Sequence, residues 1–177
     1  FDLDEFDHLV NDKTKLVVLN SPANPTGGVM PMEDLLHIAE AAQKYNFWII
    51  SDEIYARMAY DGLKVPSIIT IPGMKERTIV VDGFSKTYAM TGWRLGYAIM
   101  PLALAERVSL LLTHSVGCTA AFTQIAGIEA LTGPQNMVDQ MMKVFQVRRE
   151  RMINGLNNLP GINCQVPEGA FYAFPNS

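Results

Sequence analysis

Short, continuous apolar runs recur along the chain and predict buried strands at residues 15–20, 47–51, 78–82 and 96–100. Between the first two runs, apolar residues repeat at helical spacing over residues 31–46, with acidic residues in the first turn. This alternation of strands and helices predicts an α/β fold with a mostly parallel sheet. The connection between the last two runs is too short for a crossover helix, so we expect the last strand to run antiparallel.

The second half of the chain has a predominantly helical pattern. The spacing of its apolar residues predicts three helices, at residues 102–115, 119–131 and 137–159. The last of these carries a basic cluster that is typical of a solvated face, at Arg148, Arg149 and Arg151. We expect a strand, a turn and a second strand within residues 162–174, and a surface connection at residues 66–77.

Composition describes a folded protein without an evident polyanion partner. The 177 residues are 49% hydrophobic and 18% charged, and the net charge is −4 with no basic block. These values argue against disorder and against nucleic-acid binding. No apolar run approaches the length of a membrane span, and Cys118 and Cys164 lie far apart without histidines at metal-ligand spacing. We therefore expect a cytoplasmic protein with reduced thiols and without a metal or a membrane.

The two ends of the chain indicate that it is a piece of a longer protein. It begins Phe-Asp-Leu-Asp, without an initiator methionine, and it stops directly after a predicted strand. We therefore expect further sequence on both sides.

Polar residues follow three of the predicted strands, in loops that a parallel sheet brings to one edge. Asn24 lies in a loop rich in proline and glycine, Asp52 and Tyr55 follow the second strand, and Ser85 and Lys86 follow the third. Ligands of open α/β sheets gather at this edge. The convergence of the three loops is the main indication of a functional site.

The third loop has the chemistry expected for a phosphate-bearing carbonyl compound. Lys86 is suited to form a Schiff base with the carbonyl, while Ser85 and Arg94 hold the phosphate. Each loop taken alone also has a plainer interpretation. The first is then a simple strand-to-helix connection, Asp52 is a helix N-cap, and Lys86 is a solvated lysine.

At these positions the chain resembles the class I/II aminotransferases, fold-type I enzymes of the aspartate aminotransferase type that depend on pyridoxal 5′-phosphate. The resemblance runs through essentially all 177 residues and is carried by three blocks in the family's order. The blocks are Asn24-Pro25-Thr26-Gly27, Asp52-Glu53-Ile54-Tyr55, and Ser85-Lys86 followed by Gly92-Trp93-Arg94-Leu95-Gly96-Tyr97. Any one block is a common pattern, whereas all three in order are specific.

The resemblance implies a three-layer, mostly parallel sheet, followed by long helices and the start of a small α+β domain. Residues 1–145 are then the C-terminal part of the large domain that binds pyridoxal 5′-phosphate. Residues 146–177 are the connecting helix and the first hairpin of the small domain. The family's glycine-rich phosphate loop, its ring-stacking aromatic residue and its carboxylate-binding arginine are expected outside these residues. We therefore expect this piece alone to be inactive.

The resemblance also implies an activity and partners. The family transfers an amino group from an amino acid to a 2-oxo acid by ping-pong exchange, and it works as a homodimer with active sites across the interface. Lys86 is implied to form the internal aldimine with the cofactor and to carry the proton shift as general base and acid. Asp52 is implied to pair with the pyridine nitrogen and keep it protonated. Tyr55 is implied to donate to the 3′-oxygen.

The remaining cofactor contacts follow from the same resemblance. Asn24 is implied to donate to the 3′-oxygen beside Tyr55, and Ser85 and Arg94 to hold the phosphate. Some members carry a serine three residues before the lysine that also contacts phosphate, whereas Gly83 stands here.

Two alternatives stay open on the sequence alone. One is another reaction on the same scaffold, such as a β-lyase or a cyclopropane-carboxylate synthase. The other is the effector-sensing domain of a transcription regulator, which binds cofactor without turnover and carries an N-terminal winged-helix extension.

Overall fold

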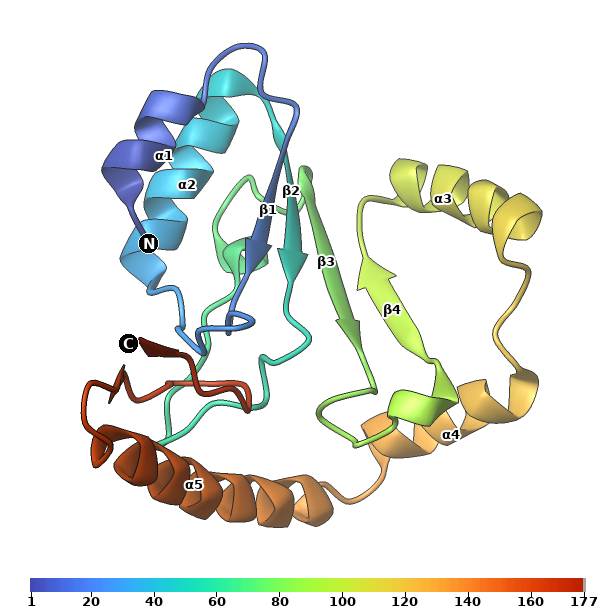
Figure 1. Cartoon of the computed structure of the whole chain (residues 1–177). Coiled ribbons are helices and arrows are strands. Elements are labelled where there is room, and N and C mark those ends of the chain that lie inside the picture. Colours follow the sequence, from blue (N-terminus) through green and yellow to red (C-terminus); the bar gives the residue numbers. More distant parts are fainter. Residues whose placement is uncertain (177) are drawn as a thin grey trace.

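A four-stranded sheet forms the centre of the molecule, with its strands in chain order (Figure 1). The structure is a computed structural model that describes residues 1–176. The strands are β1 (Leu16–Asn20), β2 (Trp48–Asp52), β3 (Thr78–Gly83) and β4 (Gly96–Ile99). The first three are parallel, and β4 pairs antiparallel with β3. The mostly parallel α/β sheet and the antiparallel last strand are both confirmed.

Two helices, α1 (Leu3–Leu9) and α2 (Met32–Tyr45), pack against one face of β1 and β2. Alternate strand residues point to this face, which explains why Ile49 is fully buried while Trp48 beside it is exposed. The α2 helix ends at Asn46, which adopts the left-handed conformation that commonly terminates helices. The chain then enters β2 after a single residue, Phe47, which is fully buried.

The segment before β3 completes this core, and the prediction of a surface connection at residues 66–77 is wrong. It contains the 3₁₀ helix η1 (Ile68–Thr70), and both Ile68 and Met74 are fully buried. The few apolar residues here lie among prolines, a glycine and polar residues and give no periodic pattern, because tertiary packing rather than a long regular element places them.

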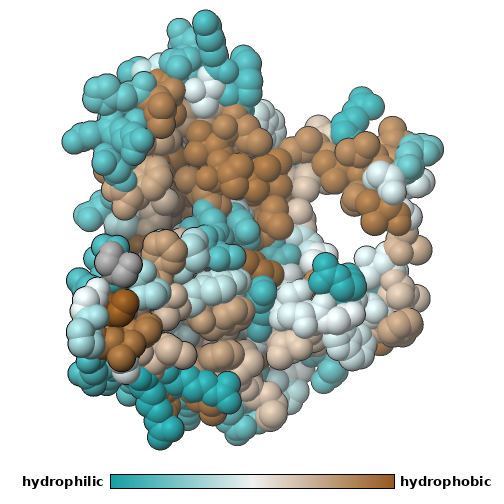
Figure 2. All heavy atoms as spheres, in the orientation of Figure 1, coloured by the Kyte–Doolittle hydropathy of each residue, from teal (hydrophilic) through white to brown (hydrophobic). Residues whose placement is uncertain are grey.

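The opposite face of the sheet carries exposed apolar side chains, seen in Figure 2 as a brown area over the strands. The exposed residues on this face of the strands include Leu16, Val18, Trp48 and Val81. The next two helices, α3 (Leu102–Ser115) and α4 (Ala121–Thr132), lie beyond β4. No residue of α3 is buried, although its pattern predicted the helix correctly.

The last part of the chain consists of α5 (Asn136–Asn157) and two short antiparallel strands, β5 (Asn163–Cys164) and β6 (Pro175–Asn176). The prediction of a second strand within residues 162–174 is wrong, because β6 begins only at Pro175. Residues 167–172 instead dock on the loops that follow β1 and β2. The predicted domain boundary after residue 145 lies inside α5, and that division stays a prediction.

Two further observations concern sequence-based expectations. Neither Cys118 nor Cys164 forms a disulfide. Within the part of the chain that the structure describes, no helix has both the length and the apolar character needed to cross a bilayer.

Candidate active site

The carboxyl ends of β1, β2 and β3 meet at one edge of the sheet (Figure 1). Asn20 ends β1 opposite Asp52, and its side chain links two of the loops that leave this edge. Its Nδ2 donates to the Asp52 carbonyl oxygen at 3.3 Å, and its Oδ1 accepts from the backbone N–H of Asn24 at 2.7 Å. The loop of Asn24 is therefore held beside the end of β2. Asn20 is not among the site residues predicted from the sequence, although it is the polar residue that ends β1.

Asp52 ends β2 and is half-buried. Turns rather than a helix follow it, so the interpretation of Asp52 as a helix N-cap is wrong. Its Oδ1 accepts one hydrogen bond, from the Ile54 backbone N–H at 3.2 Å. The adjacent Glu53 is different, because its Oε1 accepts from the hydroxyls of Ser51 and Ser67 at 2.9 and 2.5 Å. Asp52 has fewer of its acceptor positions occupied than Glu53, so its carboxylate has more capacity for a further donor.

The amine of Lys86 lies beside two neighbouring aromatic rings. Its Nζ is 5.7 Å from the ring centroid of Tyr55 and 5.2 Å from that of Phe171. Both distances are within the range of a favourable cation–π contact. Lys86 is half-buried, and within residues 1–176 no carboxylate forms an ion pair with it. Aromatic packing rather than a counter-ion therefore places this amine, and its nitrogen is available for a covalent bond.

Tyr55 is only 2% exposed, and its hydroxyl is hydrogen-bonded to the hydroxyl of Tyr172. Burial raises the pKa of Tyr55 well above its ordinary value, and the hydrogen bond to Tyr172 and the charge of Asp52 raise the pKa further. The phenol therefore keeps its proton at neutral pH and acts as a hydrogen-bond donor. Asp52, Tyr55 and Lys86 thus come together at the edge of the sheet.

The structure adds Phe171 and Tyr172, which the sequence-based set does not contain. Phe171 packs edge-on against Tyr55 with ring centroids 5.5 Å apart, and Tyr172 does the same at 5.6 Å. A signal existed in the sequence, because Phe171 and Tyr172 are adjacent. On a strand with one buried face, one of two neighbouring aromatic rings would be left in water. Here no strand forms, and both rings serve the site.

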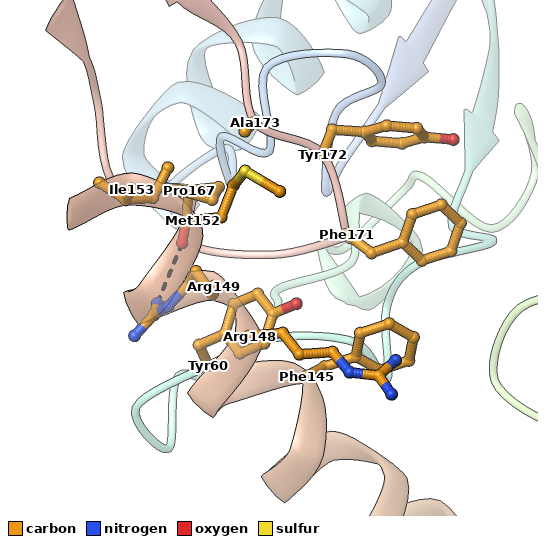
Figure 3. A pocket seen from close by; sticks show the side chains of 10 residues that line it. All are labelled: Tyr60, Phe145, Arg148, Arg149, Met152, Ile153, Pro167, Phe171, Tyr172 and Ala173. Atoms are coloured by element: carbon orange, nitrogen blue, oxygen red, sulfur yellow. Dashed lines mark hydrogen bonds between the residues drawn. The ribbon is translucent and has the colours of Figure 1, made fainter. Parts of the chain in front are cut away.

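Phe171 and Tyr172 project from the chain next to a pocket of ≈ 240 Å³ beside α5 (Figure 3). Phe145 of α5 stacks on Phe171 with centroids 5.9 Å apart and an interplanar angle of 22°. The pocket is lined by Tyr60, Phe145, Arg148, Arg149, Met152, Ile153, Pro167, Phe171, Tyr172 and Ala173. The long helix therefore supports the ring that contacts the lysine.

The expectation that Arg149 belongs to a solvated face is wrong, because its side chain is only 7% exposed. Its Nη2 binds Asp61 Oδ2 at 2.7 Å, and its Nη1 donates to the Pro167 carbonyl oxygen at 3.0 Å. The guanidinium also lies 4.4 Å from the ring centroid of Tyr60. Arg149 therefore fastens α5 to the segment that carries Phe171 and Tyr172.

The two predicted phosphate-binding residues lie on one loop but are not in contact. Ser85 directly precedes Lys86 and is half-buried. Arg94 follows the 3₁₀ helix η2 (Thr91–Trp93), and its Nη1 donates to the Thr91 carbonyl oxygen at 2.9 Å. Its side chain lines a hollow of ≈ 730 Å³ with residues of the connection between α3 and α4. Within residues 1–176, no hydrogen bond joins Arg94 to Ser85 or Lys86.

Gly83, where some members of the resembling family carry serine, has a steric reason to be glycine. A Cβ at this position would lie 3.1 Å from the Leu95 carbonyl oxygen and 3.2 Å from the Gly96 Cα. The strands β3 and β4 approach each other closely here, so a side chain would require its neighbours to shift by a few tenths of an ångström. The missing serine contact is therefore tied to the local packing of this chain.

Comparison with known proteins identifies the family. The family Aminotransferase class I and II matches residues 1–176. The chain belongs to this family. Class I and II aminotransferases use pyridoxal 5′-phosphate, so family membership implies this cofactor.

Individual aminotransferases show the same relationship. The chain is 42% identical to an aspartate aminotransferase of Musicola paradisiaca over 93% of its own length and 41% of the relative's. The solved aspartate aminotransferase of Rhizobium meliloti superposes with a TM-score of 0.95 at 36% identity, over 99% of this chain and 44% of that one. The aromatic aminotransferase of Pyrococcus horikoshii gives a TM-score of 0.94 at 40% identity, over 99% and 47%. The chain thus spans less than half the length of these aminotransferases.

Proposed function

We propose that the complete protein containing this chain is an aminotransferase that uses pyridoxal 5′-phosphate at Lys86. It moves an amino group from an amino acid to a 2-oxo acid by ping-pong exchange. The observation that carries the proposal is the position of the Lys86 amine beside the rings of Tyr55 and Phe171, at the edge where Asp52 ends β2. The names of the similar proteins, which include aspartate and aromatic aminotransferases, support an α-amino acid as substrate.

The residues of the site fit the cofactor. Its aldehyde requires an amine, and Lys86 offers one that no carboxylate within residues 1–176 engages. Its ring nitrogen requires an anion, and the Asp52 carboxylate accepts only one donor, a backbone N–H. Its phenolic oxygen requires a donor, and Tyr55 keeps its proton because burial and Asp52 raise its pKa. When bound, pyridoxal 5′-phosphate supplies an electron sink for the bonding electrons of a substrate Cα–H bond.

Lys86 carries the proton in this proposal. Once the incoming amino acid has displaced it, its amine is free to remove the proton from the substrate Cα and to deliver a proton to the neighbouring carbon. The rings of Tyr55 and Phe171 keep the amine at the carboxyl edge of the sheet and limit the access of water to it. Lys86 is therefore both the covalent anchor and the catalytic base.

Asp52 and Tyr55 set the charge around the cofactor ring. The Asp52 carboxylate holds a proton on the ring nitrogen, because an adjacent anion raises the pKa of a basic nitrogen. Tyr55, together with Asn24, donates a hydrogen bond to the 3′-oxygen. The hydrogen bond from the Asn24 backbone N–H to Asn20 holds the loop of Asn24, and aromatic packing holds the Tyr55 ring.

Ser85 and Arg94 are proposed to hold the phosphate. Arg94 has a planar guanidinium suited to bidentate contact with phosphate oxygens. Reaching a phosphate next to Ser85 requires it to exchange its contact with the Thr91 carbonyl oxygen. That contact is a single hydrogen bond of an exposed side chain, so the exchange costs little.

The assembly and location belong to the same proposal. We infer a homodimer in the cytoplasm, without nucleic-acid or membrane partners. Support for the dimer comes from family membership and from the exposed apolar side chains of β4, α3 and α4. Light scattering on the complete protein tests the dimer.

A covalent trapping experiment tests the function. The complete protein is incubated with pyridoxal 5′-phosphate, its visible absorption is recorded, and it is reduced with borohydride before peptide mapping. We expect a yellow protein with the label on Lys86. Transamination of aspartate or an aromatic amino acid with 2-oxoglutarate should accompany it.

Variants make the test specific. Lys86→Ala should remove the label and reduce transamination to background, because it removes the anchor and the base together. Asp52→Ala should keep the label but lower kcat by about 10²-fold or more, because the charge that favours the ring proton is gone. Lys64→Ala, which changes an exposed lysine, is the matched control. Normal turnover in Lys86→Ala would refute the assignment.

A further inference from the structure

We propose that Tyr172 is a positioning residue that orients the Tyr55 hydroxyl toward the cofactor. This proposal rests on the proposed function, because it concerns how one donor of that site is aimed. Tyr172 lies 117 residues after Tyr55 in the chain and belongs to the segment between β5 and β6. The late segment thereby becomes part of the site instead of only the beginning of another domain.

Tyr55 and Tyr172 contact each other through both their hydroxyls and their rings. The two hydroxyl oxygens are hydrogen-bonded to each other, and the rings meet at 80° with centroids 5.6 Å apart. Tyr55 is buried, whereas Tyr172 is only half-buried. Phe171 fills the space next to both rings, 4.9 Å from that of Tyr172. Within residues 1–176, Tyr172 is the side-chain partner of the Tyr55 hydroxyl.

Hydrogen bonds of the two residues Gly169 and Ala170 hold the segment that carries Tyr172. Ala170 donates its backbone N–H to the Met58 carbonyl oxygen at 2.8 Å, and its own carbonyl oxygen accepts from the Tyr60 hydroxyl at 2.5 Å. The backbone N–H of Gly169 donates to the Gly27 carbonyl oxygen at 2.8 Å. These bonds fasten the residues just before Tyr172 to the turn that carries Tyr55 and to the loop of Asn24. The two phenols are therefore set by one continuous network.

The role of Tyr55 depends on which of the two phenols donates its proton in the hydrogen bond between them. A phenol has one proton to donate and lone pairs with which to accept. If Tyr172 donates to Tyr55, the proton of Tyr55 is left for another acceptor, and the 3′-oxygen of the cofactor is the acceptor that the site provides. Asp52 and Lys86 are the charged groups beside Tyr55. In that arrangement, the hydroxyl of Tyr172 turns Tyr55 from a partner of the segment between β5 and β6 into a donor to the site.

The test uses Tyr172→Phe in the complete protein loaded with pyridoxal 5′-phosphate. This variant removes one hydroxyl and keeps the ring. We expect the label on Lys86 to persist and the pH midpoint of the visible absorption to rise by about 0.5–1 unit. The reason is that a less well aimed Tyr55 stabilises the deprotonated, negatively charged 3′-oxygen less, by the net value of about one hydrogen bond. An unchanged midpoint would overturn the proposal.

Two controls isolate the effect. Tyr88→Phe removes a hydroxyl that contacts Arg57 and Gln135 instead of Tyr55, and it should leave the midpoint unchanged. In a Tyr55→Phe background, Tyr172→Phe should cause no further shift, because the group through which it acts is absent. A further shift of the same size there would assign Tyr172 a separate role and contradict the proposal.

A cofactor-free measurement separates this proposal from the proposed function. In the complete protein labelled with ¹³C in its tyrosines, the Tyr55 signal is titrated with and without Tyr172→Phe. The Tyr55 titration should shift in the variant, because its hydroxyl loses the hydrogen bond with Tyr172. If no protein takes a label on Lys86, the function fails while this titration still decides the contact between the phenols. If the label forms but neither readout moves, only the positioning role fails.

Discussion

The two halves of the sheet differ sharply in how they use apolar residues. In the covered half, consisting of β1, β2, α1, α2 and η1, large apolar side chains such as Ile38 and Phe47 are fully buried. In the open half, consisting of β4, α3 and α4, most large apolar side chains are exposed, with Leu111 65% exposed and Phe122 70%. Both halves consist of helices and strands that are rich in hydrophobic residues. Only the covered half has a core.

The packing of each half affects how firmly the site residues beside it are held. Asp52 and Tyr55 leave β2, which the core fixes on its buried face, and they make their contacts within the described chain. Arg94 precedes β4 on the open side, and its guanidinium contacts only a neighbouring turn. The precision of a site residue therefore follows the packing of the strand that carries it.

The largest expected effect tests the core directly. Phe47→Ala should lower the free energy of unfolding by about 3–5 kcal/mol, because it removes a fully buried aromatic ring and leaves a cavity. Leu111→Ala in the open half should change it by less than about 0.5 kcal/mol. Urea unfolding followed by circular dichroism measures both. Equal losses in the two variants would remove the distinction between the halves.

A glycine pair tests the docking of the late segment on the covered half. A Cβ on Gly169 would lie 2.6 Å from the Pro22 side chain and 3.1 Å from the Met58 carbonyl oxygen. Gly169→Ala should therefore destabilise by about 1–3 kcal/mol through overpacking. Gly155→Ala, in α5 with nothing within 4 Å of the new Cβ, should instead stabilise by about 0.5–1 kcal/mol. Thermal unfolding midpoints that shift in the same direction for both would contradict this account.

The smallest expected effect concerns one buried hydroxyl. Tyr60→Phe should lower the free energy of unfolding by about 1 kcal/mol at pH 8, because the hydroxyl donates to the Ala170 carbonyl oxygen at 2.5 Å. Tyr45→Phe is the control, since the Tyr45 hydroxyl makes no hydrogen bond within residues 1–176, and it should change little. Urea unfolding midpoints provide the comparison.

The same variant has a defined pH dependence. Burial raises the pKa of Tyr60, and the charge of Arg149 opposes this without reversing it. A phenol whose folded pKa lies above its unfolded value of about 10 stabilises the fold fully below that pH and progressively less as pH rises through the folded pKa. Between pH 9 and 11, Tyr60→Phe should therefore lose less stability than the unmodified protein. A steeper alkaline loss in the variant would contradict the sign.

Sequence patterns predicted the regular elements and the edge of the sheet where the polar loops meet. Strand runs are continuous and helices are periodic, so β3 and α3 were found within a residue of their bounds. The buried Ile68 and Met74, the position of β6, and the burial of Arg149 were not predicted. Each depends on contacts between segments far apart in the chain, which local patterns do not contain. Tyr172 belongs to the same group, because only the folded chain brings it to Tyr55.

The loop between β3 and β4 has a consequence for engineering this protein. Gly83 and Gly96 pair across the antiparallel ladder, and Phe84 donates its backbone N–H to the Leu95 carbonyl oxygen at 3.2 Å. Lys86 and Arg94 thus lie near the two ends of one loop, and these ends are held together by the pairing of β3 with β4. Lengthening such a loop costs only the logarithm of its length in closure entropy, so its tip is open to insertion while the strand register stays fixed.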